Sequence, residues 1–114
     1  MTEKPVQWIK IAEHIDEIVF AENQIALIKA DEKNLCIGKH HENYFAFAEK
    51  CPHAGGLLAD GFIDALGNVV CPLHQYRYNL KNGYNSSGEG YFLRTMPVEI
   101  RTDGVFVGFK NSFK

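Results

Sequence analysis

Two short segments of the chain combine cysteine and histidine at spacings suited to metal binding. The first is Cys51-Pro-His53, and the second, Cys71-Pro-Leu-His74, follows after seventeen residues. Thiolate sulfur and imidazole nitrogen are common ligands of transition metals. The proline in each segment fixes φ and offers no backbone donor, which favours similar turns. The sequence therefore predicts two loop tips that close on one inorganic centre.

Two kinds of centre are compatible with two thiolates and two imidazoles. Structural zinc is one of them, but finger-type sites group the cysteines in one pair and the histidines, on a helix, in the other. Here each pair is mixed. A mixed pair suits a [2Fe-2S] cluster in which both cysteines bind one iron and both histidines bind the other, because each loop then supplies one ligand to each iron. Zinc stays the alternative, and it predicts a colourless structural module.

The rest of the sequence predicts the elements that position these loops. Short apolar runs between turn residues indicate an all-β protein of mostly antiparallel strands. A short helix is expected within 11–19, where Ile11, Ile15 and Ile18 share one face. The expected strands span 24–29, 34–38, 44–49, 61–64, 68–71, 75–79, 97–101 and 105–109, with turns at 41–43, 66–68, 81–83 and 102–104.

Length and composition limit the class of protein. The 114 residues suit one domain, and 46% apolar with 23% charged residues is ordinary for a soluble globular protein. A net charge of −2, with both signs well mixed, argues against nucleic-acid binding. The polar opening and the lack of a long apolar run predict a cytoplasmic protein with no membrane contact. The third cysteine, Cys36, is expected to be a buried structural thiol.

The two Cys/His segments and their neighbours resemble the cluster loops of Rieske [2Fe-2S] proteins, whose pattern is Cys-x-His, a spacer, then Cys-x-x-His. The first loop resembles the family at Gly55, Leu58 and Gly61. The second resembles it at Tyr78, the aromatic position, and at Gly83, the closing glycine.

This resemblance implies a Rieske-like fold, in which a small cluster-binding subdomain is inserted in a β base domain of antiparallel sheets. The whole chain, 1–114, would be a single Rieske domain, with the cluster-binding subdomain at about 50–83. The implied cofactor is a [2Fe-2S] cluster with ligands Cys51, His53, Cys71 and His74.

Departures from the family pattern indicate the subfamily. Respiratory Rieske proteins have two further cysteines, which form a disulfide, where this chain has Gly56 and Leu73, and a serine where it has Tyr76. The resemblance is therefore to soluble, low-potential Rieske-type ferredoxins, at the low end of about −150 to +300 mV. Gln75 replaces a usual glycine, so either its backbone is strained or its side chain hydrogen-bonds near the cluster.

Residues beside the ligands have implied roles as well. Backbone N–H groups near Gly55 and Gly56 would donate to the sulfides. Three leucines would form an apolar rim for docking or shield the cluster from water. These leucines are Leu57, Leu58 and Leu73, and the residues expected to surround the cluster are Gly55, Gly56, Gln75, Tyr76 and Tyr78.

The implied function is electron transfer by a protein that is not itself an enzyme. The sequence contains neither a two-histidine-one-carboxylate iron site nor a dinucleotide-binding glycine motif. We expect a monomeric carrier that takes one electron from a flavin reductase and delivers it to an oxygenase or another oxidoreductase. The alternative is a small Rieske-like subunit of a nitrite-reductase-type complex, to which the chain is also similar.

Overall fold

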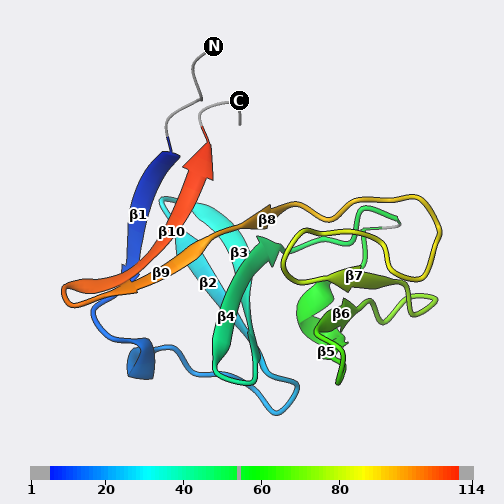
Figure 1. Cartoon of the computed structure of the whole chain (residues 1–114), viewed down its shortest axis with the longest axis horizontal. Helices are drawn as coiled ribbons and strands as arrows, with labels where there is room; N and C mark the ends of the chain where they lie inside the picture. The colour runs from blue at the N-terminus through cyan, green and yellow to red at the C-terminus, as the bar shows by residue number, and fades with distance from the viewer. Residues whose placement is uncertain (1–5, 54, 111–114) are drawn as a thin grey trace.

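The computed structural model describes residues 6–53 and 55–110, whose strands form three antiparallel sheets (Figure 1). This confirms the predicted all-β fold. One sheet has the order β1 (Val6–Ala12), β10 (Gly104–Lys110), β9 (Val98–Arg101). The central sheet has the order β2 (Ile25–Ala30), β3 (Lys33–His40), β4 (Asn43–Ala48), β8 (Thr95–Met96). The third has the order β5 (Phe62–Ile63), β6 (Asn68–Val70), β7 (Arg77–Asn79).

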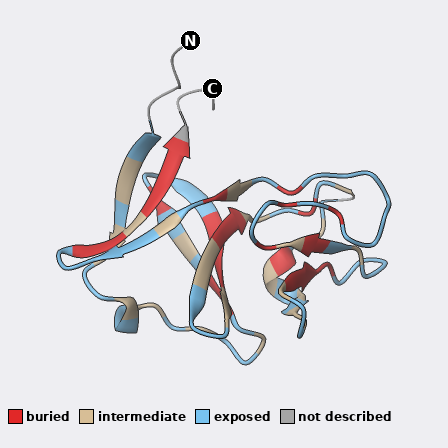
Figure 2. Ribbon diagram, viewed as in Figure 1, coloured by how far each residue is buried: buried red, intermediate tan, exposed pale blue. Residues whose placement is uncertain are grey.

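The central sheet is buried on both faces, because it lies between two hydrophobic cores. Side chains alternate along β3, so Leu35 and Ile37 pack on one face of the sheet. They belong to a core that also contains Val107 of β10, and we call this part of the molecule the base. Cys36, between them, packs on the opposite face in the core shared with the third sheet. Figure 2 shows the buried residues concentrated in β3, β4, β6 and β10. The central sheet is therefore shared by the base and the part that holds the Cys/His segments.

The third sheet belongs to an excursion between two strands of the central sheet. The chain leaves after Ala48 and returns at Thr95, and the Ala48 N–H donates to the Arg94 carbonyl at 2.9 Å where the two segments meet. In Figure 1 this excursion lies to the right of the base. The predicted cluster-binding segment, about 50–83, falls inside it.

The short helix expected within 11–19 is confirmed only as a single 3-10 turn, and its first part is wrong. Ile11 lies in β1, which pairs with β10, and the only helical residues of this region are the 3-10 turn η1 (Ile15–Glu17). β-branched isoleucines fit a pleated strand better than a helix, and nine residues are too few to form a stable helix without strong packing. Strand β1 was therefore not predicted, and neither was β8, whose two residues are too few to form a pattern.

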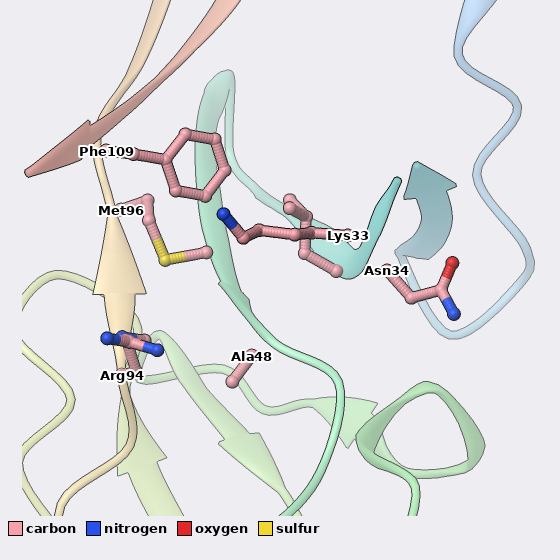
Figure 3. Close-up of a pocket in the computed structure, with 7 residues that line it drawn as sticks. Lys33, Asn34, Ala48, Arg94, Met96 and Phe109 are labelled. Carbon is pink, nitrogen blue, oxygen red and sulfur yellow. The ribbon is translucent and has the colours of Figure 1, made fainter. Parts of the chain in front are cut away.

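A cavity of about 300 Å³ opens in the base beside β3, β8 and β10 (Figure 3). Its lining is mostly apolar, and the Lys33 ammonium lies 5.6 Å from the centre of the Phe109 ring. The lining residues are Lys33, Asn34, Leu35, Ala48, Arg94, Met96 and Phe109. None of them belongs to the Cys/His segments.

Among the described residues, no helix is long and apolar enough to cross a bilayer.

Candidate metal centre

The two Cys/His segments form loops with matching backbone geometry, as the two prolines predicted. The Cys51 N–H donates to the Gly56 carbonyl at 2.8 Å, and the Cys71 N–H donates to the Tyr76 carbonyl at the same distance. Each cysteine thus begins a loop that is closed by the residue five positions further on. Just outside each loop, the chain forms an antiparallel β pair. These pairs are Lys50 with Leu57 and Val70 with Arg77. We call the two loops the first loop (51–56) and the second loop (71–76).

Both cysteines of the loops are buried, in the core shared with the central sheet. Cys51 Sγ lies 3.2 Å from the Tyr78 hydroxyl, and the Leu73 N–H donates to Cys71 Sγ at 3.4 Å. Burial raises the pKa of the Cys71 thiol and the adjacent Cys51 side chain raises it further, although the Leu73 N–H opposes both. A nearby positive charge, such as a metal ion, would favour the thiolate form of Cys71.

The histidines of the two loops face each other, with ring centres 5.2 Å apart. Nδ1 of His53 is buried and has no hydrogen-bond partner among the described residues. An unpaired buried imidazole nitrogen is costly, so it points to a ligand that the protein atoms do not supply. His74 is exposed, and its backbone is in the left-handed region, with φ of 64°.

Two tyrosines pack against the ring of His53. Tyr76 stacks on it with ring centres 4.1 Å apart and an interplanar angle of 26°, and Tyr91 meets it edge-on at 5.5 Å. The sequence predicts Tyr76 near the centre but does not predict Tyr91, which lies in the polar stretch after Gly83 that is typical of a connecting loop. Only the fold brings Tyr91 to the Cys/His loops, and no spacing rule could have found it.

The backbone at Gln75 settles one of the alternatives left by the sequence. Its φ is 59°, in the left-handed region that glycine adopts without cost. Gln75 therefore has the backbone conformation expected of glycine, and its side chain makes that conformation strained. Because His74 before it is also left-handed, the second loop turns sharply at its tip. This turn exposes the side chains of both residues.

Two of the expected neighbours have different roles in the structure. The Gly55 N–H donates to the Cys51 carbonyl at 2.9 Å, so this amide is already used and does not serve as a sulfide donor. Leu58 is fully buried beneath the loops, which excludes it from a docking rim. It lies in the turn η2 (Leu58–Asp60), whose following residue, Gly61, passes so close to the Val70 carbonyl that a Cβ would lie 1.9 Å from it.

The remaining neighbours lie close to where they were expected. Leu57 and Leu73 are 43% and 44% exposed beside the loops. Gly56 has room for little more than hydrogen, since an added Cβ would come within 2.9 Å of the Leu73 side chain and 3.3 Å of Cys71 Sγ. The loops therefore pack tightly against each other below an apolar edge formed by Leu57 and Leu73.

Comparison with known proteins agrees with this geometry. The model of the Rieske [2Fe-2S] domain matches residues 7–89, most of the chain. The chain belongs to this family. As a Rieske [2Fe-2S] domain protein, it is similar to the ferredoxin component of the alkene monooxygenase system of Xanthobacter autotrophicus, with 20% identity over 76% of this chain and 71% of that one.

Two further relatives of this Rieske protein differ in size. The ferredoxin of carbazole 1,9a-dioxygenase from Nocardioides aromaticivorans has the same fold, with a TM-score of 0.74, 18% identity, and coverage of 89% of this chain and 96% of that one. Nitrite reductase [NAD(P)H] of Emericella nidulans is 34% identical over 69% of this chain, but the match spans only 8% of the reductase.

The residues present fit the [2Fe-2S] cluster of the family. Two adjacent buried thiols and two facing imidazoles supply the donor types that such a cluster requires. Within the described part of the chain, no three Cys, His, Asp or Glu side chains group closely enough to hold one metal ion.

Proposed function

We propose that Cys51 and Cys71 hold one iron of the cluster and that His53 and His74 hold the other. The observation that carries this assignment is the buried, unpartnered Nδ1 of His53, which lies in the same pair of loops as the two adjacent thiols. When bound, the cluster accepts and releases a single electron. The two loops would orient its ligands, and the buried side chains of Leu58 and Tyr78 would exclude water from below.

The function that this site supports is that of an electron carrier rather than an enzyme. Similarity to the ferredoxin component of an alkene monooxygenase system supports delivery of the electron to an oxygenase. We propose a flavin reductase as the donor. The exposed His74, with Leu57 and Leu73 nearby, suits the small and weak interfaces of electron-transfer proteins. We infer that the carrier works as a monomer between successive partners.

Electron paramagnetic resonance with visible absorption tests the assignment directly. The wild-type protein should be red-brown and should give a rhombic signal only after reduction by dithionite, with an average g below the free-electron value. Cys71→Ser and His74→Ala should lose or alter this signal, while Cys36→Ala, a matched cysteine control in the same core, should keep it. A colourless preparation that contains zinc would overturn the proposal.

A second candidate function is a cluster-bearing subunit of a nitrite-reductase-type complex. It is favoured by the 34% identity to the fungal reductase, of which the match spans 8%. Size-exclusion chromatography of the protein from its native source distinguishes the two functions. A carrier should elute as a free small protein, whereas a subunit should elute with a large partner.

A further inference from the structure

A third loop, residues 84–92, lies against the two Cys/His loops. We propose that Asn85 is a positioning residue that holds Tyr91 of this third loop over His53, so that His74 is the imidazole left open to a partner protein. The inference rests on the proposed function, because it takes His53 and His74 as the two histidine ligands.

Asn85 is the centre of a hydrogen-bond network inside the third loop. Its side chain is buried, with only 2% of the residue exposed. Nδ2 lies 2.9 Å from the Arg77 carbonyl, 3.1 Å from Ser87 Oγ and 3.0 Å from Glu89 Oε1. Oδ1 accepts the N–H of Tyr91 at 3.3 Å. One buried amide thus joins the backbone of β7 to the residue that covers His53.

Further bonds fix the third loop to the sheet that carries the second loop. The Arg77 N–H donates to Ser87 Oγ at 3.0 Å, and the Ser86 N–H donates to the Arg77 carbonyl at 2.9 Å. Ser86 Oγ also donates to Asn68 Oδ1, 3.1 Å away on β6. Because Arg77 directly follows the second loop, these bonds tie the third loop to the segment that carries His74 and Tyr76. The position of Tyr91 relative to the histidines is therefore determined by polar contacts rather than by loose packing.

The ring of His53 is flanked by two tyrosines, and the residue is half-buried. Tyr76 stacks on it and Tyr91 meets it edge-on, and the two tyrosine rings are 5.9 Å apart. The edge-on contact of Tyr91 with His53 is one of the favourable arrangements for an aromatic pair. Tyr91 is itself 37% exposed, so it forms the outer surface above His53. A partner that approached His53 would meet Tyr91 first.

His74 lies in a different environment. It is exposed at the tip of the second loop, between Leu73 and Gln75, which are exposed as well. Its ring centre is 6.3 Å from that of Tyr76, beyond the stacking distance that Tyr76 makes with His53. The two histidines are therefore unequal, and the surface around His74 is the one that a partner can reach directly.

Chemical labelling of the cluster-loaded, oxidised protein with diethyl pyrocarbonate, read by peptide mass spectrometry, tests this asymmetry. His74 should be labelled faster than His53. Tyr91→Ala and Asn85→Ala should both increase labelling of His53, by about two- to tenfold for a lost aromatic contact, and leave His74 unchanged. Tyr91→Phe should behave as the wild type, because the phenyl ring keeps the cover.

Tyr84→Ala is the matched control. Tyr84 is in the same loop, but its ring packs on Phe92, with ring centres 5.9 Å apart. Equal labelling of the two histidines in the wild type, or unchanged labelling of His53 in Tyr91→Ala, would overturn the inference. If Asn85→Ala does not fold, Tyr91→Ala still decides.

The paramagnetic spectrum of the same samples separates this inference from the proposed function. A Rieske-type spectrum with His53 labelled as readily as His74 would refute the role of Tyr91 and leave the carrier function intact. Protection of His53 in a protein that never binds the cluster would refute the carrier function and leave the role of Asn85 and Tyr91 standing.

Discussion

The hydroxyl oxygen of Tyr78 lies 3.2 Å from Cys51 Sγ in the core beneath the first loop. Tyr78 is fully buried, and burial, followed by its contact with Cys51, raises the pKa of its phenol well above the usual range. The hydroxyl is therefore protonated at any physiological pH, and toward a thiolate it can only donate. This bond links the aromatic position of the second segment to the cysteine of the first.

Replacing Tyr78 by phenylalanine should lower the reduction potential of the cluster. A hydrogen bond to a thiolate draws negative charge from it and stabilises the reduced state more than the oxidised state, so its loss favours oxidation. The expected decrease is on the order of tens of millivolts. Protein-film voltammetry measures it, with Tyr44→Phe in the base as the control. An unchanged potential would show that the bond does not act on the cluster.

Gln75→Gly should stabilise the protein. The left-handed backbone at Gln75 costs a residue with a side chain about 1–2 kcal/mol, and glycine removes this cost. Glycine also increases the conformational entropy of the unfolded chain, which destabilises the fold by a somewhat smaller amount. The free energy of unfolding should therefore rise by up to about 1 kcal/mol. Gln75→Val should lower it, because a β-branched residue tolerates this region least. Urea denaturation measures both variants, and equal stabilities would contradict the argument.

Asp64, in the turn between β5 and β6, should make the stability depend on acid pH. Burial alone would raise its pKa, but hydrogen bonds from Asn68 and Leu66 and the nearby Arg77 outweigh it and hold the pKa below the usual value. Because the pKa of Asp64 is lower in the folded state than in the unfolded state, its carboxylate stabilises the fold at pH values above the unfolded-state pKa, near 4. This stabilisation is lost as the pH falls through the folded-state pKa.

The measurement for Asp64 is denaturant unfolding of Asp64→Asn against the wild type as a function of pH. The wild type should be more stable by about 1 kcal/mol at pH 7, and this difference should shrink below about pH 4. The exposed Asp103, in the turn between β9 and β10, gives the control variant Asp103→Asn. A difference that persists unchanged in acid would show that the carboxylate charge is not its source.

Cys36 should be chemically inert in the folded protein. It is fully buried, and burial, with a smaller effect of Glu49, raises the pKa of its thiol to about 12. At pH 8 only about one thiol in ten thousand would be a thiolate, the reactive form. Iodoacetamide should therefore label Cys36 only after unfolding, as read by peptide mass spectrometry. Labelling of the native protein would refute the structural role assigned to this cysteine.

The features that could be predicted from the sequence are those that depend on residues close together in the chain. The four Cys and His residues were recognisable because metal binding requires particular residue types at short spacings, which can be read directly from the sequence. These residues are Cys51, His53, Cys71 and His74. The antiparallel strands followed from alternating apolar residues and turn signals, which act over a few neighbouring positions. Of the two strands not predicted, β1 was mistaken in part for a helix because of its isoleucines, and β8 is too short to form a pattern.

The tertiary structure decided the features that depend on residues far apart in the chain. Leu58 looked like a rim residue beside a ligand, but the turn η2 directs it into the core. Tyr91 and Asn85 reach the site because bonds to β6 and β7 fold their loop back over His53. Nothing local distinguishes them from other polar-loop residues. Their role follows from packing, and packing is set by all the chain segments together.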